Sequence, residues 1–265
     1  MCPIIFKIGP LTIHTYGVFL AIGFIIGLIF AINQAKKQGI PKENILDLGF
    51  YILISAVVGS RLLFVIKEYK YYLKNPLDII KFWEGGLVFY GGLLLATIVV
   101  IFYTSKKTLP LWKIADIIAP SLAIGYAIAR LGCFSAGCCY GKPTELPWGV
   151  IFTDPHSLAI TGIPLHPTQL YGALASFGIF IFLITYRRHK KFEGELFWLY
   201  MLLYSVARFI IEFFRGDEAR DLIYRSFSLA QAISIAVLLI AIGFIIIYRR
   251  KKGYNINIRK YDSEW

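Results

Sequence analysis

Apolar residues fill seven stretches of the chain, each about as long as a membrane-spanning helix, and polar segments rich in lysine and arginine separate them. A bilayer core about 30 Å thick needs about 20 helical residues to cross it. The pattern therefore predicts an all-α, polytopic membrane protein with about seven transmembrane helices, built as a single integral membrane domain over residues 1–265. The predicted spans are, to within a few residues, 16–35, 45–66, 85–103, 112–133, 167–186, 195–214 and 227–248.

The basic residues between the spans indicate an orientation. The segments that follow the first, third, fifth and seventh spans hold 16 lysines and arginines, whereas the alternate segments hold 9. Because cytoplasmic segments carry the excess of positive charge, we expect the N-terminus outside and the C-terminus in the cytoplasm. A long segment at about 134–166 then faces outward. The first ten residues lack the basic region and cleavage site of a signal peptide, so we expect the first span to be retained.

Composition supports a membrane protein and bears on its partners. The chain is 57% hydrophobic and 17% charged, with a mean hydropathy of +0.64, which exceeds what a soluble core of this length needs. Its net charge is +12. The cations cluster between apolar stretches, so we interpret them as topology signals and contacts to anionic lipid headgroups, and we expect no nucleic acid partner.

Three arginines, Arg61, Arg130 and Arg208, lie inside predicted spans, where a charge at the membrane centre costs at least about 2.5–3.5 kcal/mol. Glu212 and Tyr204 each stand four residues from Arg208, so the three share one helical face. Arg208 and Glu212 are either a self-neutralising pair that locks helix packing or part of a site. This pair would neutralise only Arg208, so Arg61 and Arg130 would still need partners. All three arginines lie toward the predicted outer ends of their spans, which indicates an anionic headgroup site near the outer leaflet.

Other polar and small residues fall at the same predicted depth. Paired glycines flank Tyr90 within residues 85–92, and they permit close contact between helices or close approach of backbone to a ligand. His166 precedes a helix that begins with proline, and it is a candidate proton carrier or simply a residue of the helix start. Gln169 lies in the first turn of that helix, and Tyr16 begins the first span on the same side.

The stretch RLGCFSAGCCYG places Cys133, Cys138 and Cys139 close to Arg130. Cys133 follows Arg130 by three residues, so the cation could lower its pKa and make it a nucleophile. A metal site is a second interpretation, although the spacing differs from common zinc sites. A disulfide from Cys133 to Cys138 or to Cys139 is a third interpretation. The fourth is that the cysteines simply pack a tight glycine-rich turn.

Several blocks resemble the prolipoprotein diacylglyceryl transferases, in that family's order along nearly the whole chain. The blocks are YGVFLAIGF, VVGSRLLFVI, WEGGLVFYGGL, ARLGCFSAGCCYGKPTELPWGV, HPTQLYGAL, YSVARFIIEFFRGD and SFSLAQAIS. The resemblance implies a seven-helix body with its N-terminus outside, in the bacterial cytoplasmic (inner) membrane. It also implies transfer of a diacylglyceryl group from phosphatidylglycerol, or a similar anionic phospholipid, to the lipobox cysteine beside a prolipoprotein signal peptide. No cofactor and no metal are expected.

The resemblance also assigns roles to residues. Arg130 and Arg208 are the expected phosphate ligands, and Arg61 is an expected structural or headgroup contact. Tyr204 and Glu212 are expected to orient Arg208. The remaining family positions, expected to bind substrate or to move a proton, are Tyr16, Gly141, His166 and Gln169.

The chain departs from the family pattern at three positions. Tyr90 stands where members typically have a histidine regarded as a candidate base, Cys133 replaces an asparagine, and Cys138 replaces a glutamate. A free tyrosine has a pKa of about 10, so Tyr90 is a poor base at neutral pH unless nearby arginines lower that pKa.

The expected reaction displaces glycerol phosphate from a glycerol carbon by an incoming thiolate, with arginines stabilising the leaving phosphate and His166 or Tyr90 accepting a proton. Two alternatives stay open. One is a related lipid or acyl transferase that has another acceptor and uses Cys133 or Cys138. The other is a non-catalytic protein that binds or transports an anionic lipid.

Overall fold

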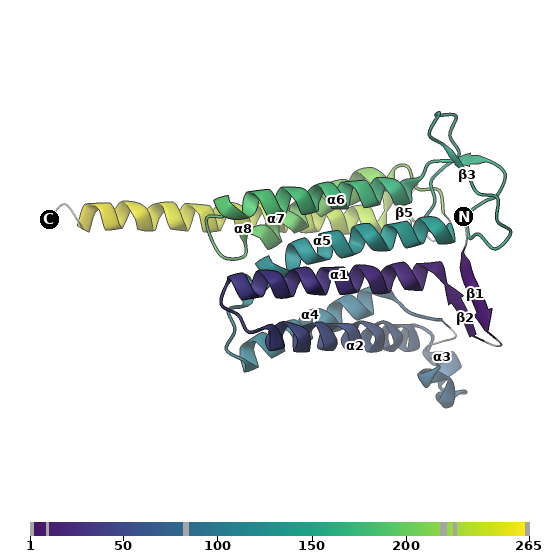
Figure 1. Ribbon diagram of the computed structural model, residues 1–265, viewed down its shortest axis with the longest axis horizontal. Helices are drawn as coiled ribbons and strands as arrows, with labels where there is room; N and C mark the ends of the chain where they lie inside the picture. The colour runs from purple at the N-terminus through teal and green to yellow at the C-terminus, as the bar shows by residue number, and fades with distance from the viewer. Residues whose placement is uncertain (1–2, 9–10, 82–84, 218–221, 225–226, 263–265) are drawn as a thin grey trace. The chain divides into compact units, whose positions relative to one another are not determined.

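The computed structural model describes residues 3–8, 11–81, 85–217, 222–224 and 227–262. Within these residues, seven helices are long and apolar enough to cross a membrane, which confirms the predicted polytopic helical fold (Figure 1). The orientation across the membrane stays a prediction, and Arg220 and Arg225, two cations counted for it, lie outside the described residues. The seven helices are α1 (Thr15–Lys37), α2 (Lys42–Lys67), α4 (Phe89–Lys106), α5 (Leu111–Ala136), α6 (Thr168–Tyr186), α7 (Glu195–Glu212) and α8 (Leu229–Asp262).

Two helix boundaries differ from the prediction. The third span begins at Phe89 rather than at residue 85, because Gly85 and Gly86 have φ angles of 94° and 71°, outside the helical region. The last helix continues to Asp262, well beyond residue 248. Its last turns are polar, so the apolar pattern did not include them.

Short antiparallel strand pairs accompany the helices, and hydrophobic patterning did not predict them. Such strands of two to five residues are too short to show a clear period of two. The pairs are β1 (Ile4–Ile8) with β2 (Leu11–His14), β3 (Val150–Ile151) with β4 (Pro164–Leu165), and β5 (Leu222–Tyr224) with β6 (Phe227–Ser228).

The chain divides into two compact units, one of residues 1–31 with 115–265 and the other of residues 32–114. In the second unit α2 packs along α4, and a β-carbon on Gly92 would lie 2.6 Å from the Ala56 carbonyl oxygen. The paired glycines after Tyr90 therefore serve close helix contact. The same unit contains the short helices α3 (Tyr69–Tyr72) and η1 (Pro76–Ile80).

In the first unit, small residues bring α1 close to α5. A β-carbon on Gly23 would lie 2.7 Å from the Gly125 carbonyl oxygen, and one on Gly27 would lie 3.0 Å from that of Ser121. Backbone contact of this kind replaces the hydrophobic driving force that is missing between helices in lipid. It fixes the helix that carries Arg130.

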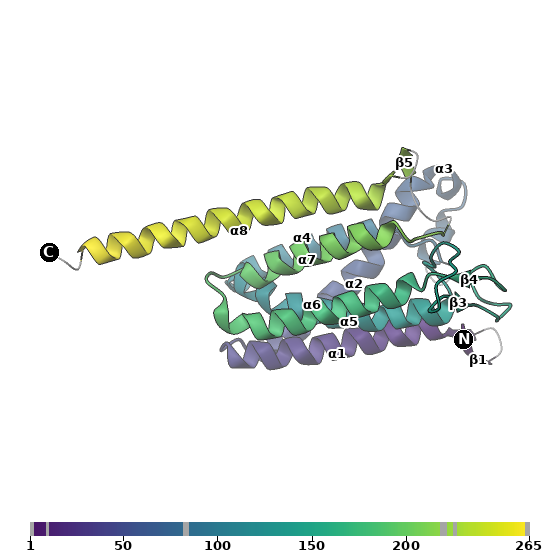
Figure 2. The ribbon, with the colours of Figure 1, turned by 90° about the horizontal axis from the view of Figure 1, so that it is seen from above.

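A buried carboxylate joins α5 to the start of α7. Asp116 accepts hydrogen bonds from the backbone N–H groups of Gly194 and Phe197, at 2.8 and 3.1 Å, and from Lys190 at 3.1 Å. A negative charge is stabilising at a helix N-terminus, where backbone N–H groups lack partners. In Figure 2, α7 runs from this junction toward the opposite end of the first unit, where α5 ends and α6 begins.

The segment after α5 folds back on that end of the unit. Residues 137–167 contain β3 and β4 and form a small core in which Phe152 and Leu165 are fully buried and contact Phe134 at the end of α5. The segment predicted at about 134–166 is thus a folded connection between two spans. That it faces outward stays a prediction.

Candidate functional site

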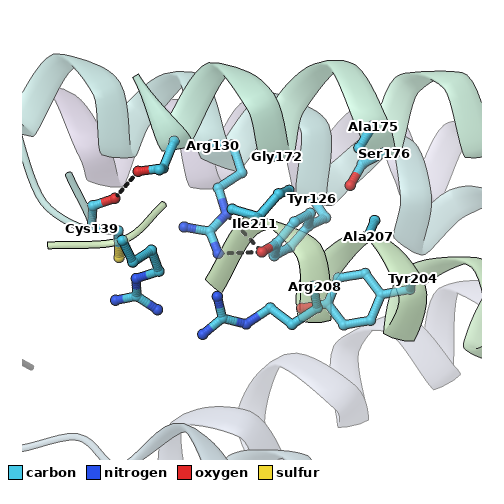
Figure 3. Close-up of a pocket in the computed structure, with 12 residues that line it drawn as sticks. Tyr126, Arg130, Cys139, Gly172, Ala175, Ser176, Tyr204, Ala207, Arg208 and Ile211 are labelled. Atoms are coloured by element: carbon cyan, nitrogen blue, oxygen red, sulfur yellow. Dashed lines mark hydrogen bonds between the residues drawn. The ribbon is translucent and has the colours of Figure 1, made fainter. Parts of the chain in front are cut away.

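A partly open cavity lies among the end of α5, the beginning of α6 and the end of α7 (Figure 3). Arg130 of α5 and Arg208 of α7 line it, and so does Arg215, which follows α7. Apolar side chains of Ala207 and Ile211 complete part of its wall. The cavity therefore combines three guanidinium groups with an apolar surface.

Arg130 is hydrogen-bonded to the phenol of Tyr126. Tyr126 precedes Arg130 by one helical turn, and its hydroxyl accepts hydrogen bonds from Nε, at 2.7 Å, and from Nη2. The guanidinium carbon also lies 4.7 Å from the centre of the Tyr126 ring. Among the described residues, no carboxylate lies within 4 Å of Arg130. A neutral phenol leaves the positive charge available to an anion.

Arg208 and Arg215 are paired with acidic side chains. Glu212, which is 1% exposed, lies 2.6 Å from Arg208 and 3.5 Å from Arg215. Asp217 accepts two hydrogen bonds from Arg215, at 2.8 and 2.6 Å. The predicted ion pair between Arg208 and Glu212 is therefore present, and it also belongs to a network that lines the cavity.

Tyr204 also lines the cavity, and its described ring contacts are to other tyrosines. Its ring stacks on Tyr200 at 5.8 Å and meets Tyr126 edge to face at 5.3 Å. Tyr204 thus supports the phenol that binds Arg130, and Glu212 holds Arg208 by an ion pair. That Tyr204 orients Arg208 stays a prediction.

The first turn of α6 holds in place the turn at residues 137–139 that contains Cys138 and Cys139, here called the cysteine turn. The Thr168 hydroxyl donates to the Cys139 carbonyl at 2.6 Å, and the Gln169 side chain, fully buried, donates to the Cys138 carbonyl at 2.9 Å. Gln169 therefore stabilises the cysteine turn, and it is not among the described residues that line the cavity. Cys139 has a φ of 58°, in the left-handed region that few residues other than glycine adopt.

The thiols of Cys133, Cys138 and Cys139 are free in the structure. Cys138 donates to the Cys133 carbonyl at 3.7 Å, and Cys133 itself is buried in the last turn of α5. Of the three, Cys139 lines the cavity. Among the described residues, no group of three histidine, cysteine, aspartate or glutamate side chains is placed to hold a metal ion.

Gly141 and His166 belong to a backbone junction beside the cavity. The Gly141 N–H donates to the His166 carbonyl at 3.0 Å, and a β-carbon on Gly141 would lie 2.5 Å from that oxygen. His166 Nδ1 lies 3.1 Å from the Tyr171 hydroxyl, to which the Trp148 indole N–H donates at 2.9 Å. His166 is not among the described residues that line the cavity. The backbone contacts thus give Gly141 a packing role.

Tyr16 lies in the first turn of α1 and is 40% exposed. A β-carbon on Gly132 of α5 would lie 3.2 Å from the Tyr16 Cα atom, so the two helices meet there. Tyr16 is therefore close to the cysteine turn but is not a described wall of the cavity.

Arg61 and Tyr90 lie in the second unit. Arg61 donates four hydrogen bonds to backbone carbonyls, and its guanidinium stacks on Phe64 and Tyr72. The four carbonyls that Arg61 binds belong to Asp78, Ile79, Gly85 and Gly86. Of the two roles expected for Arg61, these contacts supply the structural one.

Tyr90 is 38% exposed, and its ring meets Phe89 edge to face at 5.8 Å.

Sequence reasoning missed Tyr126, Arg215 and Asp217 as parts of the site. Tyr126 has the same spacing from Arg130 as Tyr204 has from Arg208, so the four-residue rule could have found it. Arg215 was counted only as a loop cation, because it lies just beyond the predicted span. Nothing in the sequence places it against the end of α5.

Comparisons with known proteins bear on the family of this chain. The sequence model of the prolipoprotein diacylglyceryl transferase family matches residues 3–247. The phosphatidylglycerol–prolipoprotein diacylglyceryl transferase of Clostridium tetani is 36% identical over 252 residues, which cover 95% of this chain and all of that protein. Proteins of the same name from Bacillus velezensis and Finegoldia magna are 35% and 36% identical, over 95% and 93% of this chain and 93% and 95% of their own lengths. The chain therefore belongs to the prolipoprotein diacylglyceryl transferase family.

Proposed function

We propose that this protein transfers the diacylglyceryl group of phosphatidylglycerol to the cysteine thiol of a prolipoprotein, in the cavity between Arg130 and Arg208. One observation carries the proposal: three guanidinium groups line one cavity, and Arg130 has a phenol in place of a carboxylate among its described partners. The names of the relatives supply the two substrates. A phosphodiester anion is the ligand that such a cavity favours.

The reaction needs stabilisation of negative charge more than it needs an acid. The incoming sulfur attacks the glyceryl carbon bonded to the phosphate oxygen, the carbon–oxygen bond breaks, and glycerol phosphate departs with the electron pair. Guanidinium groups bind phosphate oxygens through pairs of hydrogen bonds, and donors placed where charge develops lower the barrier most. Arg130 and Arg208 take this role in the proposal, and Arg215 reinforces it.

The apolar part of the wall suits the other half of the donor. Ala175, Ala207 and Ile211 line the cavity beside the arginines, so the glyceryl carbons would face apolar atoms while the phosphate faces cations. An active site without excess water strengthens electrostatic interactions. The proposal places the protein in the bacterial cytoplasmic membrane, with the cavity toward the outer leaflet and the prolipoprotein signal peptide as its partner.

The test is a transfer assay with Arg130→Ala and, as a matched control, Arg188→Ala, which removes an exposed arginine of η3 (Arg187–His189). Each protein is reconstituted in phosphatidylglycerol vesicles with a prolipoprotein peptide, and the release of glycerol phosphate is measured. Loss of one charge-stabilising donor typically lowers turnover about 100-fold or more, so Arg130→Ala should lose at least that factor while the control keeps wild-type turnover.

Two results would contradict the proposal. Turnover of Arg130→Ala near that of the wild type would remove the arginine cavity as the site. Binding of phosphatidylglycerol by the wild type without release of glycerol phosphate would instead indicate a non-catalytic lipid-binding protein. Complementation of cells depleted of their own diacylglyceryl transferase gives the corresponding result in a living membrane.

A further inference from the structure

Cys139 lies at the cavity wall, and neither the family resemblance nor the proposed function gives it a role. Its α6 partner, Thr168, fixes its carbonyl, and the buried Gln169 fixes the carbonyl before it. The left-handed backbone at Cys139 is a strained conformation, of the kind that persists where surrounding contacts enforce it. Figure 3 shows Cys139 at one end of the cavity, beyond Arg130 and Arg208.

The surroundings of this thiol favour its negatively charged form. Interaction with the Cys133 and Cys138 thiols, aided by the positive charges of Arg130 and Arg215, holds the pKa of Cys139 well below its usual range, although burial opposes this. The same coupling raises the pKa of Cys138, so Cys139 loses its proton more readily than Cys138. The titratable and charged groups that face the cysteine turn are Tyr16, Arg130, Cys133, Cys138 and Arg215.

We propose that the Cys139 sulfur is the proton acceptor for the incoming prolipoprotein thiol in the transfer proposed above, on which this inference rests. His166 is held by Tyr171 and is not a described wall of the cavity. The other proton-accepting groups described in the wall are the phenols of Tyr126 and Tyr204, which are weak bases at neutral pH. A thiolate in the same wall accepts a proton more readily than a neutral phenol, and a nearby phosphate charge raises its proton affinity.

The step balances in protons and electrons. The S–H bond of the incoming cysteine breaks, and its proton moves to the Cys139 sulfur. The new thiolate forms a carbon–sulfur bond to the glyceryl carbon, and the electron pair of the broken carbon–oxygen bond stays on glycerol phosphate. Cys139 then returns its proton to the departing phosphate or to water.

Cys139 is not a covalent nucleophile in this scheme. If its sulfur attacked the glyceryl carbon, the product would be a thioether. Completing the transfer would require a second displacement with a thiolate as leaving group from an alkyl carbon, and the arginines could not stabilise it as they stabilise phosphate. Cys133, the nucleophile considered from the sequence, is buried and is not among the described residues that line the cavity.

Binding of the donor lipid would prepare the base. Of the three cavity arginines, Arg208 and Arg215 are paired with the carboxylates of Glu212 and Asp217. A phosphodiester placed among the same arginines adds a negative charge near the thiolate, and a like charge raises the affinity of an acid group for its proton. The lipid thus makes Cys139 a stronger base at the moment when the acceptor thiol arrives.

The experiment compares Cys139→Asp with Cys139→Asn. Both side chains tolerate a left-handed backbone and have nearly the same size, but only aspartate carries a base. Turnover and KM for phosphatidylglycerol are measured in the transfer assay, with Ser135→Ala as a control because the Ser135 hydroxyl bonds only to the Leu131 carbonyl of its own helix among the described contacts. General base catalysis contributes about 100-fold to 10,000-fold, so Cys139→Asn should lose at least about 100-fold in kcat with little change in KM, and Cys139→Asp should recover part of it.

The pH profile separates a base from a merely structural cysteine. Without a base, the rate follows the ionised fraction of a free thiol with a pKa of about 8.5, so it rises about tenfold per pH unit between pH 6 and 8. Cys139→Asn should show this rise. The rate of the wild type should rise less steeply with pH there, because Cys139 accepts the proton of the incoming thiol.

A second measurement does not depend on folding of the variants. Wild-type protein in phosphatidylcholine vesicles is alkylated with iodoacetamide at pH 7, and the modified cysteine is identified by mass spectrometry. Cys139 should react faster than an ordinary thiol, and phosphatidylglycerol should slow it. Slow alkylation of Cys139 without phosphatidylglycerol, or Cys139→Asn turnover within threefold of wild type, would overturn this inference and leave the proposed function standing. A wild type that releases no glycerol phosphate would overturn both.

Discussion

The buried carboxylate that joins two arginines of the cavity allows a quantitative test. In Glu212→Gln, the side chain keeps its shape and loses its charge. Glu212 lies 2.6 Å from Arg208 and 3.5 Å from Arg215, and all three side chains are at least four-fifths buried. In an effective dielectric of about 20, these separations correspond to attractions of about 6 and about 5 kcal/mol. The cost of removing three charges from water offsets much of this sum.

Removing one partner of a buried ion pair typically lowers the free energy of unfolding by about 3–5 kcal/mol, because the other charge stays buried. Glutamine retains a hydrogen-bond acceptor, so we expect a loss near about 3 kcal/mol. In a chain of this size, each kcal/mol lowers the Tm by about 2–4 °C, which gives a decrease of about 6–12 °C. Thermal unfolding in detergent micelles, followed by tryptophan fluorescence, measures it.

The control removes an exposed charge of similar geometry. Lys81 lies 2.6 Å from Asp78 and is 40% exposed, and exposed pairs contribute at most about 1 kcal/mol. Lys81→Gln should therefore lower the Tm by less than about 4 °C. Equal shifts for Glu212→Gln and Lys81→Gln would refute the conclusion that Glu212 holds the cavity arginines by a buried network.

Two further substitutions test how the structure holds its arginines. Arg61→Lys replaces a planar group that makes four hydrogen bonds by a single ammonium, so chemical denaturation should show a free energy of unfolding lower by about 2 kcal/mol; an unchanged value would contradict the structural role. A β-carbon on Gly172 would lie 3.4 Å from Arg130 Nε, an ordinary contact, so Gly172→Ala should keep glycerol phosphate release while Gly172→Leu, by displacing the guanidinium, should lower it at least about tenfold in folded protein. Equal glycerol phosphate release by Gly172→Ala and Gly172→Leu would contradict the conclusion that a displaced Arg130 guanidinium lowers the activity.

The helices were predictable because length and hydropathy act locally. A stretch of about 20 apolar residues has few alternatives in a bilayer, where every backbone N–H and C=O must be satisfied within the segment. The errors lie at the ends. Gly85 and Gly86 delay the start of α4, and the polar continuation of α8 carries no apolar signal. Both depend on backbone conformation more than on hydropathy.

The candidate site was only partly predictable. The cost of a charge in lipid pointed to Arg130 and Arg208, and helical spacing gave the pair between Arg208 and Glu212. The same cost also pointed to Arg61, whose hydrogen bonds go to backbone carbonyls. Cost in lipid identifies a residue that needs partners, but it does not say whether those partners are protein or ligand.

By itself, the sequence determined the seven helices, the family and two of the cavity arginines, because each depends on local composition, local spacing or ordered motifs. Only the tertiary structure decided that Arg215 and Cys139 join these arginines around one cavity. It also separated Cys139, at the wall, from the buried Cys133. The physical reason is that the cavity forms where the ends of three helices distant in sequence come together, and no local pattern encodes how those ends pack.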